Sequence, residues 1–105
     1  MSLALTFTSQ MHKLIDLLGT PLEYTHGSMT ENVTGAVVPF GRGDESLINS
    51  IGIEGRKLYL KNVIHTPKKF DTFKETVSGV TYSVYDVHPA VVDGKLIGYF
   101  CLVKA

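Results

Sequence analysis

The fold class is decided by FKETVSGVTYSVYDV, residues 73–87, and by VVDGKLIGYFCLV, residues 91–103. Each stretch holds two runs rich in β-branched and aromatic residues, separated by a short turn. Ser78-Gly79 and Asp93-Gly94 form the turns, because these residues tolerate the positive φ angles of tight hairpins. The spacing therefore predicts two consecutive β-hairpins, with strands at Phe73–Val77, Val80–Val87 and Leu96–Val103.

A single helix is predicted near the start of the chain, at Phe7–Leu18. Gly19 suits the position just after a helix, and Pro21 prevents the helix from continuing. Apolar residues recur at helical spacing on one face, which we expect to pack on the sheet. This apolar stripe consists of Phe7, Met11, Leu14, Ile15 and Leu18.

The middle of the chain adds three strands and one long loop. In Leu58-Tyr59-Leu60-Lys61, apolar side chains alternate with amphipathic ones, as in a strand with one buried face. Strands are predicted at Leu22–His26, Val33–Phe40 and Arg56–Val63, with a long loop at 41–55. We therefore predict a mainly β fold: a small antiparallel β-barrel or sandwich of about six or seven strands with one N-terminal α-helix.

Composition restricts the classes of function. The 105 residues predict one domain, and a hydrophobic content of 44% is typical of a folded chain. Ten Lys and Arg residues balance ten Asp and Glu residues, so charge gives no reason to expect specific nucleic-acid binding. No apolar run reaches the roughly 18 residues of a membrane span, and we predict no membrane partner.

Several motifs that could carry chemistry have simpler explanations. Arg42-Gly43-Asp44 matches the integrin-recognition tripeptide, but such a tripeptide also arises by chance in polar loops. Cys101 lies in an apolar run without a partner base, and the four histidines lack the close spacing of zinc ligands. Asp44 and Glu45 are adjacent carboxylates on a loop, where solvation is commoner than catalysis. The sequence thus predicts no catalytic, cofactor or metal site, and no enzyme.

The long loop carries more aliphatic side chains than a solvated loop normally does. Either these side chains pack on the core as a flap, or they fold against a neighbouring chain. Its candidate interface residues are Arg42, Asp44, Leu47, Ile48, Ile51 and Ile53.

The order of motifs from Leu58 to Val103 carries a family resemblance. A strand leads to a Pro-x-x-x-Asp turn at Pro67–Asp71, then to a hairpin through Gly79. Val87-His88-Pro89 follows, before the Asp-Gly turn and the closing strand. With the N-terminal helix, this layout resembles the head–tail joining proteins of tailed phages, the lambda-type tail-attachment or neck connector family.

The resemblance implies a structural protein of the virion neck, made in the cytoplasm of a bacterial host. Such proteins form a ring between the portal side of the head and the tail. The implied partners are further copies of the chain, a portal or head-completion protein and a tail protein, with no cofactor. Gly41–Ile53 corresponds by position to the loop that the family would place at inter-subunit or neck contacts.

A second interpretation stays open. The chain could be a small monomeric ligand-binding or enzyme-accessory β-barrel, with loop 41–55 as a lid. A connector should self-associate and have no deep polar pocket. A ligand-binding barrel should be monomeric and should hold a cavity with a few convergent polar groups.

Overall fold

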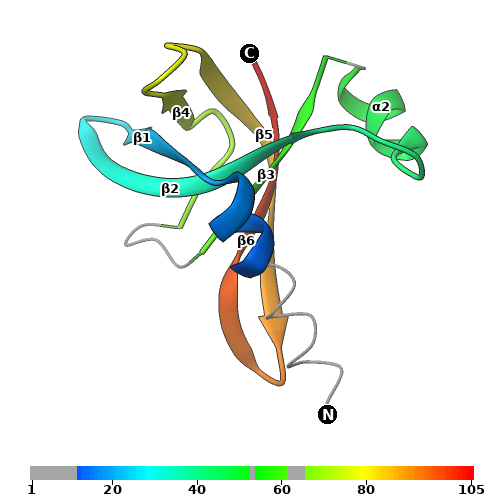
Figure 1. Cartoon of the computed structure of the whole chain (residues 1–105). Coiled ribbons are helices and arrows are strands. Elements are labelled where there is room, and N and C mark those ends of the chain that lie inside the picture. Colours follow the sequence, from blue (N-terminus) through cyan, green and yellow to red (C-terminus); the bar gives the residue numbers. More distant parts are fainter. Residues whose placement is uncertain (1–11, 53, 62–65) are drawn as a thin grey trace.

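Six strands of the chain close into an antiparallel barrel, shown in Figure 1. The computed structural model describes residues 12–52, 54–61 and 66–105. Around the barrel the strands follow the order β1-β2-β3-β6-β5-β4, and β4 pairs with β1 to close it. The predicted class, mainly β with an N-terminal helix, is confirmed. The strands are β1 (Thr20–His26), β2 (Met29–Pro39), β3 (Arg56–Leu60), β4 (Thr72–Glu75), β5 (Thr81–Val92) and β6 (Lys95–Lys104).

Side chains fill the inside of the barrel. Leu58 and Leu60 on β3 are fully buried, while Tyr59 between them lies on the outer face, as the alternation predicts. Tyr24 stacks on Phe73 with ring centroids 4.6 Å apart. Cys101 is buried in the same core, and burial raises the pKa of its thiol to about 12. The buried core residues are Leu22, Tyr24, Leu58, Leu60, Phe73, Val84, Tyr99, Cys101 and Val103.

The N-terminal helix lies on the outside of the barrel, and residues 12–18 of it are described. Ile15 is buried against Ala36 of β2 in a small second core, and Leu14 is half-buried beside it. The predicted stripe is wrong at Leu18, which is 56% exposed. The N–H of Gly19 makes the last helical bond, to the Ile15 carbonyl 2.7 Å away. The helix ends there because Pro21 has no N–H with which to continue it, and β1 follows at once. Phe7 and Met11 of the stripe lie outside the described residues.

The β5–β6 turn has its predicted length, whereas the β1–β2 and β4–β5 connections do not. Asp93 and Gly94 form the predicted two-residue turn, with φ angles of 51° and 74°. The β4–β5 connection, in contrast, is a five-residue loop at 76–80 rather than a Ser-Gly turn. Glu75 closes it, accepting a hydrogen bond from the N–H of Gly79 and donating its own N–H to the Val80 carbonyl. The turn between β1 and β2 spans only residues 27–28, because β2 begins at Met29 rather than at the predicted Val33.

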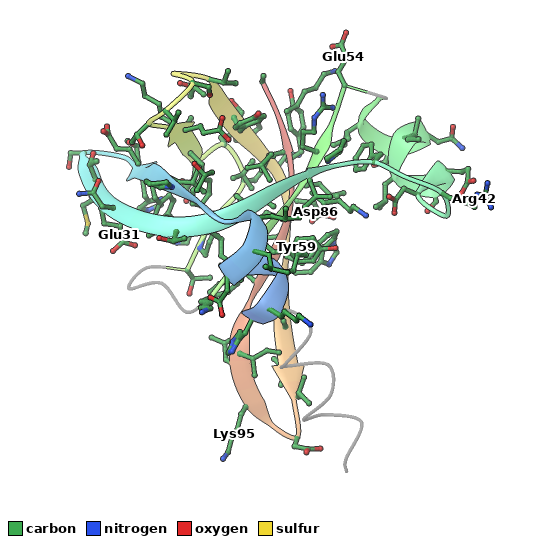
Figure 2. All side chains as sticks on the ribbon, in the orientation of Figure 1. Glu31, Arg42, Glu54, Tyr59, Asp86 and Lys95 are labelled. Carbon is green, nitrogen blue, oxygen red and sulfur yellow. The ribbon has the colours of Figure 1, made fainter. Side chains whose placement is uncertain are left out.

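Strand β5 runs through Pro89 to Val92, beyond the predicted strand end at Val87. Among the described residues, β4 pairs only with Thr81–Ser83 of β5, so the outer edge of β5 is unpaired around Pro89. Proline is tolerated on such an edge because no N–H is needed there. His88 accordingly lies within the strand, opposite Phe100. Beyond the barrel, β5 and β6 continue as a projecting two-stranded ribbon with Lys95 near its tip (Figure 2).

Candidate interaction site

The predicted long loop contains a short helix, α2 (Glu45–Ile51), which projects from the barrel between β2 and β3 (Figure 1). The prediction of a loop throughout residues 41–55 is wrong over these seven residues. Gly52 ends α2 with a φ of 93° and donates its N–H to the Ile48 carbonyl, 2.7 Å away. Seven residues between flanking glycines are too few to show a helical period, so the pattern indicated only a loop.

Asp44 fastens α2 to the barrel. Its Oδ2 accepts a hydrogen bond from the N–H of Gly41, 2.7 Å away, and lies 2.8 Å from Nζ of Lys57 on β3. The hydrogen bond from Gly41 and then the Lys57 ammonium lower the pKa of the Asp44 carboxyl. Arg42 is exposed at the outer end of the loop (Figure 2). The Arg-Gly-Asp tripeptide therefore has its carboxylate occupied within the chain.

The aliphatic side chains of α2 are only partly covered. Leu47, Ile48 and Ile51 are half-buried, and α2 has no buried residue. Ile51 packs towards Phe40 and the buried Gly55, where an added Cβ would overlap both neighbouring side chains. The C-terminal end of α2 thus rests on the barrel, while Leu47 and Ile48 keep part of their apolar surface exposed to solvent. Ile53 lies outside the described residues.

A second turn, Lys68–Asp71, presents an aromatic side chain to solvent. The N–H of Asp71 donates to the Lys68 carbonyl at 3.1 Å, which places Lys69 and Phe70 at the tip. Phe70 has a φ of 76°, and its side chain is 74% exposed. The third residue of a type II turn needs such a positive φ and is normally Gly. Nζ of Lys69 lies 5.3 Å from the centroid of the Phe70 ring.

The buried carboxylate of Asp71 holds this turn. Its Oδ2 accepts hydrogen bonds from the Tyr24 hydroxyl at 2.6 Å and from the N–H of Lys68 at 2.8 Å. Its Oδ1 lies 2.7 Å from Nδ1 of His26. Burial opposes the charge, but the hydrogen bonds from Tyr24, His26 and Lys68 outweigh it and lower the pKa of Asp71. The carboxylate is therefore ionised at neutral pH and fixes the turn to β1.

The turns at 41–44 and 68–71 share one construction. In each, the fourth residue is an Asp whose N–H donates to the carbonyl of the first residue, at 3.2 Å and 3.1 Å. In each, its carboxylate accepts the N–H of that first residue, at 2.7 Å and 2.8 Å. The third residue has positive φ in both, 92° at Gly43 and 76° at Phe70. The chain thus uses Gly at this position in one turn and Phe in the other.

A hollow beside the Asp71 cluster is too small for a substrate. Its volume is about 30 Å³, enough for about two water molecules. Small-molecule sites usually span about 300–1,000 Å³. His26 and the neighbouring Tyr24 line this hollow, together with Met29, Thr30 and Glu31 of β2. Within the described part of the chain, no three His, Cys, Asp or Glu side chains gather as metal ligands would.

Known proteins give no further guide to function. The chain matches no protein-family model, no curated protein and no solved structure. Within residues 12–52, 54–61 and 66–105, no helix has the length and hydrophobicity needed to cross a membrane. Function is therefore inferred from the surfaces that α2 and the Lys68–Asp71 turn present.

Proposed function

We propose that this chain is a structural head–tail joining protein of a tailed phage or prophage, a neck connector that forms a ring between the portal side of the head and the tail. It acts by protein–protein contact. The proposal draws on the resemblance across Leu58–Val103. The observation that carries it is the projecting helix α2, which has three aliphatic side chains and no buried residue.

The energetics of α2 favour contact with another chain. Full burial of an exposed Leu or Ile side chain contributes about 1.5–3 kcal/mol. Leu47, Ile48 and Ile51 are already half-buried in the isolated chain, so a partner that covers them gains the remaining part of that energy at each. The helix is already formed and is tied to β3 through Asp44 and Lys57. A partner that covers α2 therefore gains apolar burial without the cost of ordering a flexible segment.

The ligand-binding alternative gains less support from the same geometry. Stacked rings of Tyr24 and Phe73 and the surrounding aliphatic side chains occupy the barrel interior. The hollow at the barrel surface holds about 30 Å³. Ile51 of α2 packs towards Phe40 on the outside of the barrel, which is not the position of a lid over an internal cavity.

Complementation of a phage that lacks this gene tests the proposal. Ile48→Asp places a charge on the half-buried face of α2, whereas Asn49→Asp places the same charge on its exposed face. We expect Ile48→Asp to fold normally and to lower infectious titre at least about tenfold, the effect of roughly 1.4 kcal/mol at one contact. Filled heads and free tails should accumulate, while Asn49→Asp keeps full titre.

One outcome would contradict the role of α2, and another would contradict the connector proposal itself. Equal titres for both variants, with normal folding, would show that α2 is not the assembly surface. Normal joining of heads to tails in the complete absence of the gene would show that the chain is not a connector.

A further inference from the structure

Phe70 combines an unfavourable backbone conformation with an exposed ring. Its φ of 76° disfavours a residue with a bulky side chain, and 74% of the side chain remains exposed. Strained residues in well-ordered turns occur mainly at functional sites. The chain itself supplies a comparison, because the matching position of the 41–44 turn is Gly43. Folding therefore has no need of an aromatic side chain at Phe70.

The turn holds the backbone of Phe70 in place. The N–H of Phe70 donates to the Val84 carbonyl at 2.8 Å, and the N–H of Val84 donates to the Asp71 carbonyl at 2.9 Å. The Asp71 carboxylate is held in turn by the Tyr24 hydroxyl, 2.6 Å away. Binding through this ring therefore costs little backbone ordering, and aromatic residues are enriched among the residues that dominate binding energy in protein interfaces.

The charges around the ring indicate the chemistry of its partner. Lys68 and Lys69, the first two residues of the turn, are exposed, and Nζ of Lys69 lies 5.3 Å from the ring centroid. The nearest acid in the sequence, Asp71, is buried and bound within the chain. A complementary surface therefore offers an apolar pocket with carboxylates at its rim.

We propose that Phe70 is an anchor that inserts into an apolar, acid-rimmed pocket on a neighbouring neck protein, with Lys68 and Lys69 pairing to carboxylates at the rim. The inference rests on the proposed function in placing the partner in the neck. A protein pocket is favoured over nucleic acid, because the chain has a formal net charge of zero. Binding through the phosphate backbone relies on several Lys and Arg side chains that neutralise phosphates, and this turn carries two lysines.

Binding of the purified protein to particles tests this anchor. Heads and tails from a phage lacking the gene are incubated separately with wild-type protein, Phe70→Ser or Val77→Ser, and the bound protein is measured. Val77 is the matched control, since it is 83% exposed and its φ is not positive. We expect Phe70→Ser to weaken binding to one particle type at least about 30-fold, as at an interface hot spot. Val77→Ser should bind like wild type.

Phe70→Gly tests whether the Phe70 side chain serves binding or the stability of the fold. Gly adopts the positive φ of this position without strain. The melting temperature of Phe70→Gly should equal or exceed that of wild type, while its particle binding falls as far as that of Phe70→Ser. Lys68→Gln with Lys69→Gln should weaken binding less and should reduce its dependence on salt.

Three other results would refute the Phe70 anchor, the connector proposal or the protein pocket. If wild type binds and restores joining, and both Phe70 variants bind equally well, the anchor is refuted and the connector proposal stands. If wild type binds neither heads nor tails, the connector proposal fails and the anchor fails with it. If Phe70→Ser instead loses affinity for a fluorescent duplex oligonucleotide that wild type binds, the ring contacts nucleic acid and the protein pocket is refuted.

Discussion

The hydroxyl of Tyr24 offers a direct test of how Asp71 holds the Lys68–Asp71 turn. Tyr24→Phe keeps the ring and its stack on Phe73, where the centroids lie 4.6 Å apart. It removes only the donor that lies 2.6 Å from Oδ2 of Asp71. Tyr24 is 1% exposed, so bulk water has little access to replace the lost hydrogen bond.

The expected cost follows from the charge of the acceptor. A hydrogen bond to a charged group contributes about 1.5–3 kcal/mol, and we expect Tyr24→Phe to lower the free energy of unfolding by that amount at pH 7. The folded state lowers the pKa of Asp71 below its ordinary value of 3.8. The stabilisation is therefore complete above about pH 4 to 5 and is lost as pH falls through the lower folded pKa. The difference between variant and wild type should shrink in acid.

Urea unfolding followed by circular dichroism measures both quantities, at pH 7 and at about pH 3. Tyr85→Phe is the matched control, because Tyr85 on β5 is 42% exposed. Exposed substitutions usually change stability by less than about 0.5 kcal/mol. A loss below that size for Tyr24→Phe at pH 7, or an equal loss at both pH values, would show that the charged carboxylate of Asp71 does not hold β1 to the turn.

Two further predictions concern packing. Ile15 is 2% exposed, so Ile15→Ala should lower the free energy of unfolding by about 2–5 kcal/mol. The control Leu17→Ala, at a side chain 72% exposed, should change it little. Similar losses for both variants would show that the helix does not pack through Ile15. At Gly35, an added Cβ would lie 2.7 Å from Cδ2 of Leu60, so Gly35→Ala should cost about 1–3 kcal/mol by overpacking. Gly41→Ala is the control, since an added Cβ there meets no atom of the described chain within 4 Å. Equal melting temperatures for Gly35→Ala and Gly41→Ala would refute overpacking at Gly35.

Local patterns predict those parts of the fold that depend on neighbouring residues. The alternation at Leu58-Tyr59-Leu60 predicts the buried face of β3, and Asp93-Gly94 predicts the β5–β6 turn. Closure of the barrel depends instead on β1 pairing with β4, where Tyr24 lies opposite Phe73. Nothing in either strand's sequence specifies that register, so the sequence leaves barrel and sandwich equally open.

The wrong strand ends have one cause. Local residue preferences predict where a strand ends, but the pairing of strands in the folded barrel decides it. Val77 is apolar and precedes Ser78-Gly79, which predicts a strand end, yet it is 83% exposed in the β4–β5 loop. Proline normally interrupts a strand, yet Pro89 lies within β5, whose outer edge is unpaired there among the described residues. Local composition does not show which strand edges will be paired.

The candidate site is only partly readable from the sequence. Aliphatic residues at 47, 48 and 51 indicate an unusual segment, but not that Asp44 ties it to Lys57 on β3. The Pro67–Asp71 motif indicates a turn, but its supporting residues Tyr24 and His26 come from β1, more than forty positions earlier. The positive φ of Phe70 contradicts the usual preference for Gly in such a turn, so no composition rule predicts it.

The two Asp-clamped turns show how the chain accommodates that exception. At residues 41–44 the third residue is Gly43, so the turn carries no strain from a side chain. At Phe70 a bulky residue in the left-handed region costs about 1–3 kcal/mol. The buried carboxylate of Asp71 accepts a hydrogen bond from the Tyr24 hydroxyl, whereas the more exposed Asp44 pairs with the Lys57 ammonium. A bond to a buried carboxylate contributes about 1.5–3 kcal/mol, which is enough to offset that strain. The polar cluster at the end of β1 therefore makes an exposed, strained aromatic compatible with a stable turn.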